Sequence, residues 1–454
     1  MRTVLRILTV VILGLSLIAT ASAEKRRLRV GVFDVDASPP IGSPLAYDPT
    51  KEITTPLSCR GIVLVGSGKP IVMCAVDWIG IGNDGQFAFR NSIATAVGTQ
   101  LDRVVVHTLH QHDAPRCDFS VDRLLEGYGL SGTGFDPRFA QHVIEKAATA
   151  ASEAAKKAAP VTHMGIAEGF VEKVASNRRI LGEDGKVKHI RWTASRDPKI
   201  RAFPAGTIDP KLKLLTFWAG DKPSAAVSWY ATHPQSYYRT GGANPDFPGL
   251  ARNAVEKATK VPLIHFNGAG GNIGAGKWND GSRENRQILA DRVAAGMQRA
   301  WASTKPFSIT ADDVAWAVEP VVLPAAPHLN EEALKTILAD DKATPATRWA
   351  AGSNLVWLRR CQAKDKIDIA CLSIGKARVL HMPGELFVEY QLAAQKLRPD
   401  LFVAMAAYGD YAPGYIGTEI AYSQGGYETS ERASRVAPSV EKTLMTAVRK
   451  LLKK

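Results

Sequence analysis

The chain has 454 residues, of which 45% are hydrophobic and 22% are charged. This composition excludes a disordered or collagen-like protein, and the length is sufficient for a sizeable buried core. The formal net charge of +13 is compatible with contact to anionic membranes. Because the lysines and arginines are scattered and form no basic block interleaved with aromatic residues, we do not expect nucleic-acid binding.

Residues 1–23 have the pattern of a secretory signal peptide. Arg2 and Arg6 accompany an apolar run, and the run ends in the small residues "ASA". The competing reading is a membrane anchor, but the run is shorter than the roughly 20 residues that a span needs. We therefore expect cleavage after Ala23 and a secreted or periplasmic protein of residues 24–454, with a net charge of +11.

Five cysteines are too few for a disulfide scaffold in a chain of this length. No C-x-x-C pair occurs, which disfavours a thiolate zinc site. Cys361 and Cys371 bracket a charged turn and could bridge in an oxidising compartment.

Strand and helix patterns alternate along the chain. In chain order we expect strands within 27–40 and 60–81, a helix within 85–102, a strand at 103–109, a helix at about 137–159, strands within 212–220 and 224–234, a strand and glycine-rich loop within 260–276, a helix from about 284, a strand–strand–turn–helix run within 368–397 and a basic helix at 439–454. We find no internal repeat. The alternation predicts one large α/β unit of mixed sheets with surrounding helices.

Chemically capable side chains follow the ends of several predicted strands. His110 and His112 follow the predicted strand at 103–109, His233 lies at the end of the one within 224–234, and Glu385 follows a later strand. Loops at strand ends are where open α/β sheets place their sites, so we expect these side chains to converge.

The glycine loop "GAGGNIGAGKW" at 268–278 invites a nucleotide-binding interpretation. Gly271 to Lys277 match a P-loop, but Trp278 stands where the Mg²⁺-binding hydroxyl belongs. The dinucleotide fingerprint also fails, because position 273 is Ile. The loop is either a close backbone approach to a ligand or a tight strand-to-helix turn.

The segment "RVVVHTLHQHDAPRC" contains three of the ten histidines of the chain. On an extended segment the side chains of His110 and His112 would point to the same face, as in an H-x-H metal site. His233 adds an imidazole and Glu385 a carboxylate. Two histidines and a carboxylate with an open position suit catalytic zinc. The alternative is a set of buried structural histidines.

The motifs "LHQHDAP", "YATHPQS", "NGAGGNIGAG", "MPGELFVEY" and "GYIGTEIAYSQGGYE" resemble, in the same order, motifs of the neutral ceramidases over most of residues 28–435. The resemblance implies a single large catalytic domain of neutral ceramidase type. It implies zinc ligands at His110, His233, Glu385 and Tyr415. It further implies catalytic roles for His112, Arg178 and Tyr427.

Two departures from that family pattern bear on function. The family has G-D-V-S-P in the glycine loop, whereas this chain has Asn272 and Gly274 in place of the aspartate and the serine. A serine nucleophile is therefore missing at that position, and we expect the loop to contact the substrate or its oxyanion through Asn267, Gly270, Gly271, Asn272 and Gly274. The chain also ends soon after "GGYE" and a basic helix, so we expect no C-terminal immunoglobulin-like domain.

These observations predict a secreted zinc-dependent hydrolase that cleaves an amide (N-acyl) bond of a small-molecule or lipid-like substrate with a zinc-activated water. One alternative is a metal-dependent esterase or deacetylase, and another is a non-catalytic module that binds glycans or cell-wall polymer. Asp410, in "YGDYAPGY", either orients a ligand or forms a turn.

Overall fold

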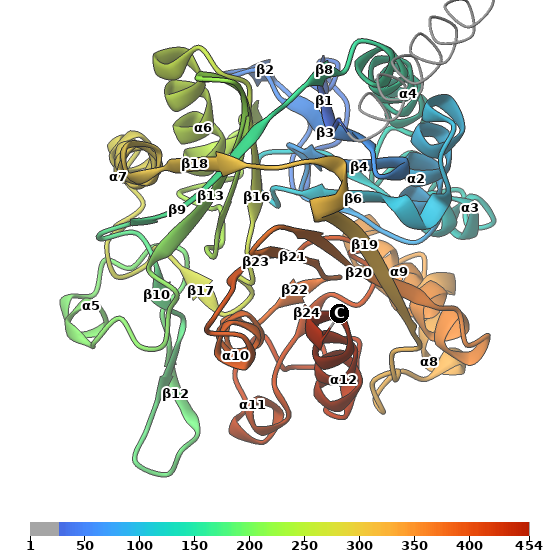
Figure 1. Ribbon diagram of the computed structural model, residues 1–454. Helices are drawn as coiled ribbons and strands as arrows, with labels where there is room; N and C mark the ends of the chain where they lie inside the picture. Colours follow the sequence, from blue (N-terminus) through green and yellow to red (C-terminus); the bar gives the residue numbers. More distant parts are fainter. Residues whose placement is uncertain (1–26, 454) are drawn as a thin grey trace, which may run out of the picture.

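Three β-sheets, each containing one pair of parallel strands, make up the body of the molecule (Figure 1). The computed structural model describes residues 27–453, and the predicted signal peptide lies outside them. The first sheet has the order β6-β4-β3-β1-β8, the second β16-β14-β13-β9-β18 and the third β19-β20-β21-β23.

The strands of the three sheets have the following bounds. The first sheet consists of β1 (Arg29–Asp36), β3 (Ser58–Gly66), β4 (Gly68–Val76), β6 (Val104–Thr108) and β8 (Ala159–Pro160). The second consists of β9 (His163–Phe170), β13 (Lys211–Ala219), β14 (Lys222–Tyr230), β16 (Leu263–Asn267) and β18 (Lys305–Ser308). The third consists of β19 (Val314–Val321), β20 (Ile367–Ile374), β21 (Ala377–His381) and β23 (Phe402–Ala406).

The same supersecondary unit occurs once in each sheet. An antiparallel hairpin (β3–β4, β13–β14 or β20–β21) continues through a crossover helix into a strand parallel to its second member (β6, β16 or β23). The crossover helices are α2 (Asp84–Val97), α6 (Asp246–Thr259) and α10 (Val388–Leu397). The sequence carries no detectable repeat, yet the fold repeats this unit three times.

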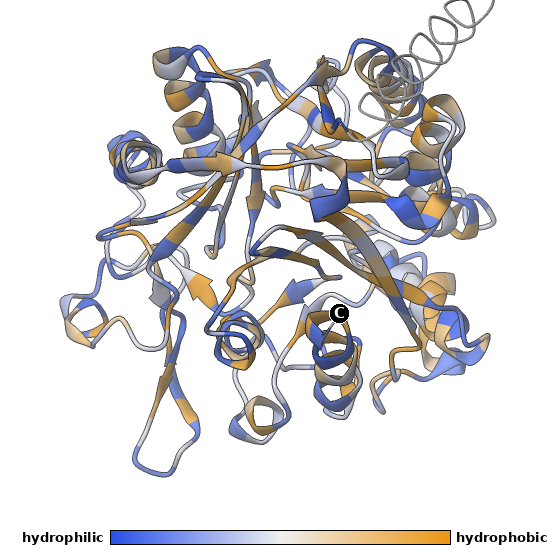
Figure 2. Ribbon diagram, in the orientation of Figure 1, coloured by the Kyte–Doolittle hydropathy of each residue, from blue (hydrophilic) through white to orange (hydrophobic). Residues whose placement is uncertain are grey.

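One face of each sheet points to a shared apolar centre and helices cover the other face. Side chains from all three sheets form one core cluster, among them Met73, Phe217, Phe266 and Val379. On the outside, α4 (Pro137–Lys156) packs on the first sheet, α7 (Glu284–Ser303) on the second and α12 (Val440–Lys453) on the third. Figure 2 shows helices with hydrophobic and hydrophilic residues on different sides, as expected for helices that bury a single face.

Hydrogen bonds join the carboxyl ends of the three parallel strands β6, β16 and β23. Asn267, at the end of β16, accepts from Ala407 N through its carbonyl at 3.0 Å and donates through its side chain to Leu109 O. Thr108 N, at the end of β6, donates to Tyr408 O at 3.0 Å. The segments that follow these strands therefore start from one place, which we call the strand junction.

Two-residue ladders accompany the three sheets. These ladders are formed by β5 (Gly80–Ile81) with β7 (Arg116–Cys117), β22 (Glu385–Leu386) with β24 (Tyr415–Ile416), β10 (Ser176–Asn177) with β17 (Ile273–Gly274), and β2 (Glu52–Ile53) with β15 (Gly242–Ala243). A hairpin of β11 (Arg179–Leu181) and β12 (Val187–Ile190) projects from the body (Figure 1). The remaining helices are η1 (Leu101–Arg103), α3 (Phe119–Glu126), α5 (Pro198–Ala202), η2 (Ala311–Asp313), α8 (Glu331–Ala339), α9 (Pro345–Gln362) and α11 (Glu419–Gln424).

The expectation of an α/β fold with mixed sheets and surrounding helices is confirmed. The long helix expected at 137–159 is α4, which begins at Pro137 after the N-cap Asp136. The suggested bridge between Cys361 and Cys371 is wrong, since both thiols are free. Cys361 lies in the last turn of α9, which ends at Gln362, whereas Cys371 lies in the middle of β20. None of the described helices is long and apolar enough to cross a membrane.

A buried ion pair clamps the first sheet to the crossover helix of the second. Asp77 follows β4 and receives both Nη1 and Nη2 of Arg252 in α6, at 2.7 and 2.9 Å. Both side chains are 0% exposed. Burial alone would raise the pKa of Asp77, but Arg252 lowers it below its ordinary value, so the carboxylate stays charged.

We expect Asp77→Asn to lower the free energy of unfolding by about 3–5 kcal/mol, because Arg252 would remain buried without a counter-charge. Urea denaturation followed by circular dichroism measures this loss. The matched control is Asp400→Asn, which removes one partner of the surface pair with Arg398 and should leave the midpoint unchanged. Equal effects of the two substitutions would contradict the assignment of a clamp.

We also expect acid to destabilise the protein through His107, which lies in β6 beside the strand junction. Its Nδ1 donates to Ala407 O at 2.7 Å, and burial lowers the pKa of the ring to about 4. The unfolded chain, with a histidine pKa near 6.5, binds a proton at pH values where the folded chain does not. Stability that is present above about pH 6.5 is therefore lost as the pH falls, by about 2–3 kcal/mol at pH 4.5 from this group. Denaturation at pH 7 and 4.5 should show a smaller difference in His107→Asn than in the wild type; an unchanged difference would contradict the assignment.

Candidate functional site

Three side chains from the three repeated units converge beyond the strand junction. His110 follows β6, His233 follows β14 and Glu385 begins β22. His110 Nε2 lies 3.1 Å from Glu385 Oε2, and His233 Nδ1 lies 3.8 Å from the same oxygen. All three side chains are at most 2% exposed, so the cluster is shielded from solvent.

The hydrogen bond of His110 leaves an unpaired nitrogen that faces the carboxylate. Its Nδ1 lies 2.6 Å from Ile79 O, which can only accept, so Nδ1 carries the proton. Nε2 of His110 and Oε2 of Glu385 are buried atoms with no hydrogen-bond partner, whereas the ring of His233 is also hydrogen-bonded to the backbone of Gly270. A neutral imidazole nitrogen and a carboxylate oxygen at 3.1 Å both present lone pairs, and a cation between them would satisfy both.

Two tyrosines hold Glu385 in place. Tyr411 donates from its hydroxyl to Oε1 of Glu385 at 2.8 Å, which leaves Oε2 turned toward the histidines. Tyr415 is the direct partner of Glu385 in the parallel ladder of β22 and β24. Burial alone would raise the pKa of Glu385, but the neighbouring His110, Tyr411 and Tyr415 lower it. The carboxylate is therefore ionised in the cluster.

His112 lies on the other side of His233. Its Nε2 is 2.9 Å from His233 Nε2, and its Nδ1 is 3.0 Å from both Tyr47 Oη and Gln235 Nε2. Burial, with the nearby charges of His110 and Arg178, lowers the pKa of His112 well below its ordinary value. His233 shifts in the same direction, mainly through burial. Both rings are therefore neutral at neutral pH.

Two sets of three ligands share His110 and His233 and differ in the third member. The nearest ligand atoms of His110, His112 and His233 lie within 4.8 Å of one another, which suffices for a metal ion. In the alternative set Glu385 replaces His112. Both nitrogens of His112 have hydrogen-bond partners, whereas Oε2 of Glu385 has none. The second set therefore agrees better with the hydrogen bonding.

Arg178 and Tyr427 form a polar and aromatic wall beside the cluster. Arg178 donates from Nη1 to Tyr415 Oη at 3.0 Å and pairs through Nε with Glu428 at 3.1 Å. Its guanidinium carbon lies 5.7 Å from the ring centre of Tyr427. Burial lowers the pKa of Arg178, but Tyr415 and Glu428 raise it further, so it keeps its charge. Tyr415 stacks on His233 with an interplanar angle of 4°.

The glycine loop packs between the segments that carry His233 and Glu385. His233 N donates to Ile273 O at 3.0 Å, and Gly271 N donates to Leu386 O at 2.9 Å. The side chain of Asn272 bonds Val388 N and Glu389 Oε2, and that of Asn267 bonds Leu109 O. The remaining predicted loop positions also lie here: Gly270 packs on the backbone of Thr232, and Gly274 beside the side chain of Arg178. An oxyanion-binding role for the loop stays a prediction.

Two expectations about local structure are wrong. His110 and His112 do not lie on an extended segment, because β6 ends at Thr108 and His110 adopts a left-handed backbone with φ of 66°. This turn, and not strand alternation, brings the two rings to 5.1 Å between centres. Asp410 contacts none of the cluster residues; it pairs with Arg360 at 2.6 Å and accepts from Ala412 N, which is the turn-forming alternative.

A cleft of about 400 Å³ opens onto the cluster. Its lining includes His112, His233, Arg178, Tyr415 and Tyr427. All five are predicted site residues, and they come from distant parts of the chain. A substrate in this cleft would touch both imidazoles and the arginine.

Comparison with solved structures identifies the architecture. The chain superposes on a ceramidase complexed with C2 with a TM-score of 0.68 and 17% identity, over 94% of this chain and 76% of that one. The chain has the neutral ceramidase fold. A neutral ceramidase from Pseudomonas aeruginosa gives a TM-score of 0.66 and 18% identity, over 94% of this chain and 73% of that enzyme. Neither a scan of protein-family models nor a search of curated proteins gave a match.

The sequence-based expectation of a ceramidase-type fold is thus confirmed. At 17–18% identity this likeness concerns the fold, and the roles of individual residues depend on the geometry above. Sequence reasoning missed Tyr411 and Tyr408, whose rings lie 5.3 and 4.7 Å from that of His110, and Glu428, which holds Arg178. Both tyrosines belong to the motif "YGDYAPGY", in which only Asp410 and Tyr415 were proposed as functional residues.

We expect Gly271→Ala to disturb the cluster through the backbone. An added Cβ would lie 2.3 Å from Glu385 O, so the strand that carries Glu385 would have to move. The expected loss is about 1–3 kcal/mol of unfolding free energy. Gly274→Ala is the matched control, because its Cβ would meet only the Arg178 side chain at 3.4 Å. Thermal denaturation of both variants tests this, and equal losses would contradict it.

Proposed function

We propose that this chain is an exported zinc-dependent hydrolase that cleaves an amide (N-acyl) bond. The observation that carries the proposal is the convergence of His110, His233 and Glu385 in one buried cluster, with unpartnered ligand atoms on His110 and Glu385. Tyr415, the ladder partner of Glu385, completes a set of four ligands. Zinc bound there would lower the pKa of a water molecule to about 7 and polarise a substrate carbonyl.

The residues around the ligands fix their orientation. Ile79 O holds the tautomer of His110 that leaves Nε2 free, and Tyr411 turns Oε2 of Glu385 toward the histidines. Hydrogen bonds of this kind position metal ligands and raise their basicity.

His112 and Arg178 act on the substrate. His112 is kept neutral, so it accepts the proton of the attacking water and then passes it to the leaving amine. Arg178 stays cationic and, together with the hydroxyl of Tyr427, stabilises the negative charge that develops on the carbonyl oxygen.

We expect one zinc ion per chain in the mature protein, residues 24–454, and loss of that ion in His110→Ala, His233→Ala and Glu385→Ala. Elemental analysis of the purified proteins measures it. His112→Ala should keep the ion and lose amide hydrolysis. Retention of zinc in this variant would show that Glu385, and not His112, is the third ligand beside His110 and His233. His142→Ala, on the exposed side of α4, is the control and should keep both.

A wild-type protein that takes up no metal after zinc addition would overturn the hydrolase and favour a non-catalytic binding module. Loss of zinc in His112→Ala with retention in Glu385→Ala would instead support the three-histidine set. Matched amide and ester substrates distinguish an amidase from an esterase, because the metal content is the same in both.

A further inference from the structure

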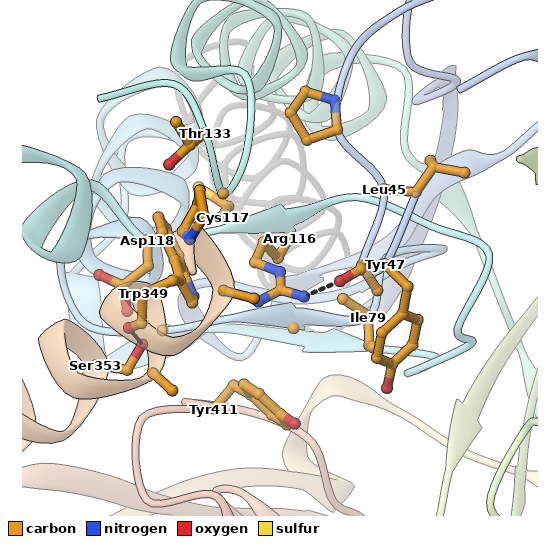
Figure 3. A pocket seen from close by; sticks show the side chains of 18 of the residues that line it. Leu45, Tyr47, Ile79, Arg116, Cys117, Asp118, Thr133, Trp349, Ser353 and Tyr411 are labelled. Atoms are coloured by element: carbon orange, nitrogen blue, oxygen red, sulfur yellow. Dashed lines mark hydrogen bonds between the residues drawn. The ribbon is translucent and has the colours of Figure 1, made fainter. Parts of the chain in front are cut away.

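A second and larger hollow adjoins the cluster. It has a volume of about 690 Å³, and it shares Tyr47 and Tyr427 with the cleft described above. Tyr411, which bonds Glu385, forms part of its wall. Figure 3 shows Arg116 in the middle of this hollow, between Tyr47 and Trp349. We call it the arginine pocket.

Arg116 is an unpaired cation in this pocket. Nη2 donates to Ala46 O, whereas Nε is buried and has no hydrogen-bond partner. Among residues 27–453 no carboxylate forms an ion pair with Arg116. Its guanidinium carbon lies 5.7 Å from the ring centre of Trp349. Arg116 is half-buried, and its guanidinium faces the hollow without a counter-charge, so an anionic ligand there could form charge-assisted hydrogen bonds with it.

A second arginine adds positive charge to the same pocket. Arg435 bonds Asn354 Oδ1 and Ala412 O and, in the part of the chain that the structure describes, pairs with no carboxylate. Burial, opposed by nearby acidic groups and assisted by the charge of Arg116, lowers the pKa of Arg435. The two arginines are therefore close enough to influence each other.

The two carboxylates in the lining, Asp48 and Asp118, form no ion pair with these arginines. Asp118 lies in the lining, but burial raises its pKa to about 7, so a large part of it is uncharged at neutral pH. Its side chain is also engaged with Val121 N and Asn83 Nδ2. Asp48 also lies in the lining. The pKa of Arg116 is lowered by burial and raised by the nearby Tyr47, Tyr411 and Asp118.

Apolar side chains form the rest of the wall. Leu45, Ile79, Pro345 and Trp349 surround the arginines, and Figure 3 shows Leu45 and Ile79 on one side of Arg116 and Trp349 on the other. A ligand that fits must present an apolar body and one anionic group. The volume of about 690 Å³ lies in the range of small-molecule binding pockets.

We propose that the arginine pocket binds an anionic group of the substrate, a carboxylate or a phosphate attached to an apolar body, through Arg116. This assignment of a substrate class rests on the proposed hydrolase function, because the pocket adjoins its ligands through Tyr47, Tyr411 and Tyr427. The preferred substrates are then anionic amides and not neutral ones.

Binding tests the pocket without turnover. Octanoate and octyl phosphate are titrated calorimetrically into the wild type, with neutral octanamide as the ligand control. We expect both anions to bind more tightly than octanamide and to lose about 10- to 100-fold in affinity in Arg116→Gln. Arg116→Lys keeps the charge and should keep most of the binding. The matched control is Arg299→Gln, since Arg299 also bonds a backbone carbonyl but lies exposed in α7.

Equal affinity in the wild type and Arg116→Gln, or no binding of either anion, would contradict the proposal that the pocket binds an anion through Arg116. The stronger of the two anions identifies the headgroup. Circular dichroism shows whether Arg116→Gln is folded; if it is not, loss of binding is judged from Arg116→Met, and unchanged binding there would overturn the pocket.

Turnover tests the substrate class separately. N-octanoylglycine and N-octanoylglycinamide differ only in the charge of one group, and we expect kcat/KM to favour the acid by about tenfold or more, with the preference lost in Arg116→Gln. Equal turnover of the two would overturn the substrate assignment. Binding of the anions through Arg116 without hydrolysis of any amide would support the pocket and contradict the hydrolase.

Discussion

The hydrogen bonds at the strand junction are the constraint on which the rest of the molecule depends. Asn267 connects the ends of β16, β6 and β23 through one side chain and one carbonyl. Each of these strands belongs to a different sheet, so a single buried residue sets where three chain segments leave the core. His110, His233 and Glu385 then need only short turns to meet. The relative positions of the cluster side chains are therefore set mainly by the sheets, and the loops add only short turns.

The electrostatics of the cluster follow from its burial. The neutral rings of His112 and His233 and one ionised carboxylate lie buried at the end of the cleft, and the polar atoms Nε2 of His110 and Oε2 of Glu385 have no partner. Such an arrangement is unfavourable unless a cation joins it. The left-handed backbone of His110, and of Tyr408 stacked upon it, adds local strain of the kind that is common at functional sites. The same reasoning applies to Arg116, where the missing partner is an anion.

The sequence was sufficient to select His110, His233 and Glu385 as side chains that lie together, and insufficient for their environment. Hydrophobic runs that end in His, His or Glu located His110, His233 and Glu385, because strand ends meet wherever parallel strands do. The turn at His110 could not be predicted, since left-handed φ values at residues other than glycine arise from tertiary contacts. The threefold repeat was also invisible, because its units share a hydrogen-bonding pattern and no residue pattern. Arg116 was hidden for a simpler reason: whether an arginine is paired depends on neighbours from distant segments.

The distribution of the ligands over all three sheets has a consequence for the order of events during folding. His110 and Glu385 are 275 positions apart, so they become neighbours only after the first and third sheets have docked on the second. Contacts of such long range form late. A partly folded chain therefore offers a metal ion at most one or two ligands and holds it weakly. Under the proposed metal binding, uptake of the ion would mark the completion of folding and would stabilise only the folded protein.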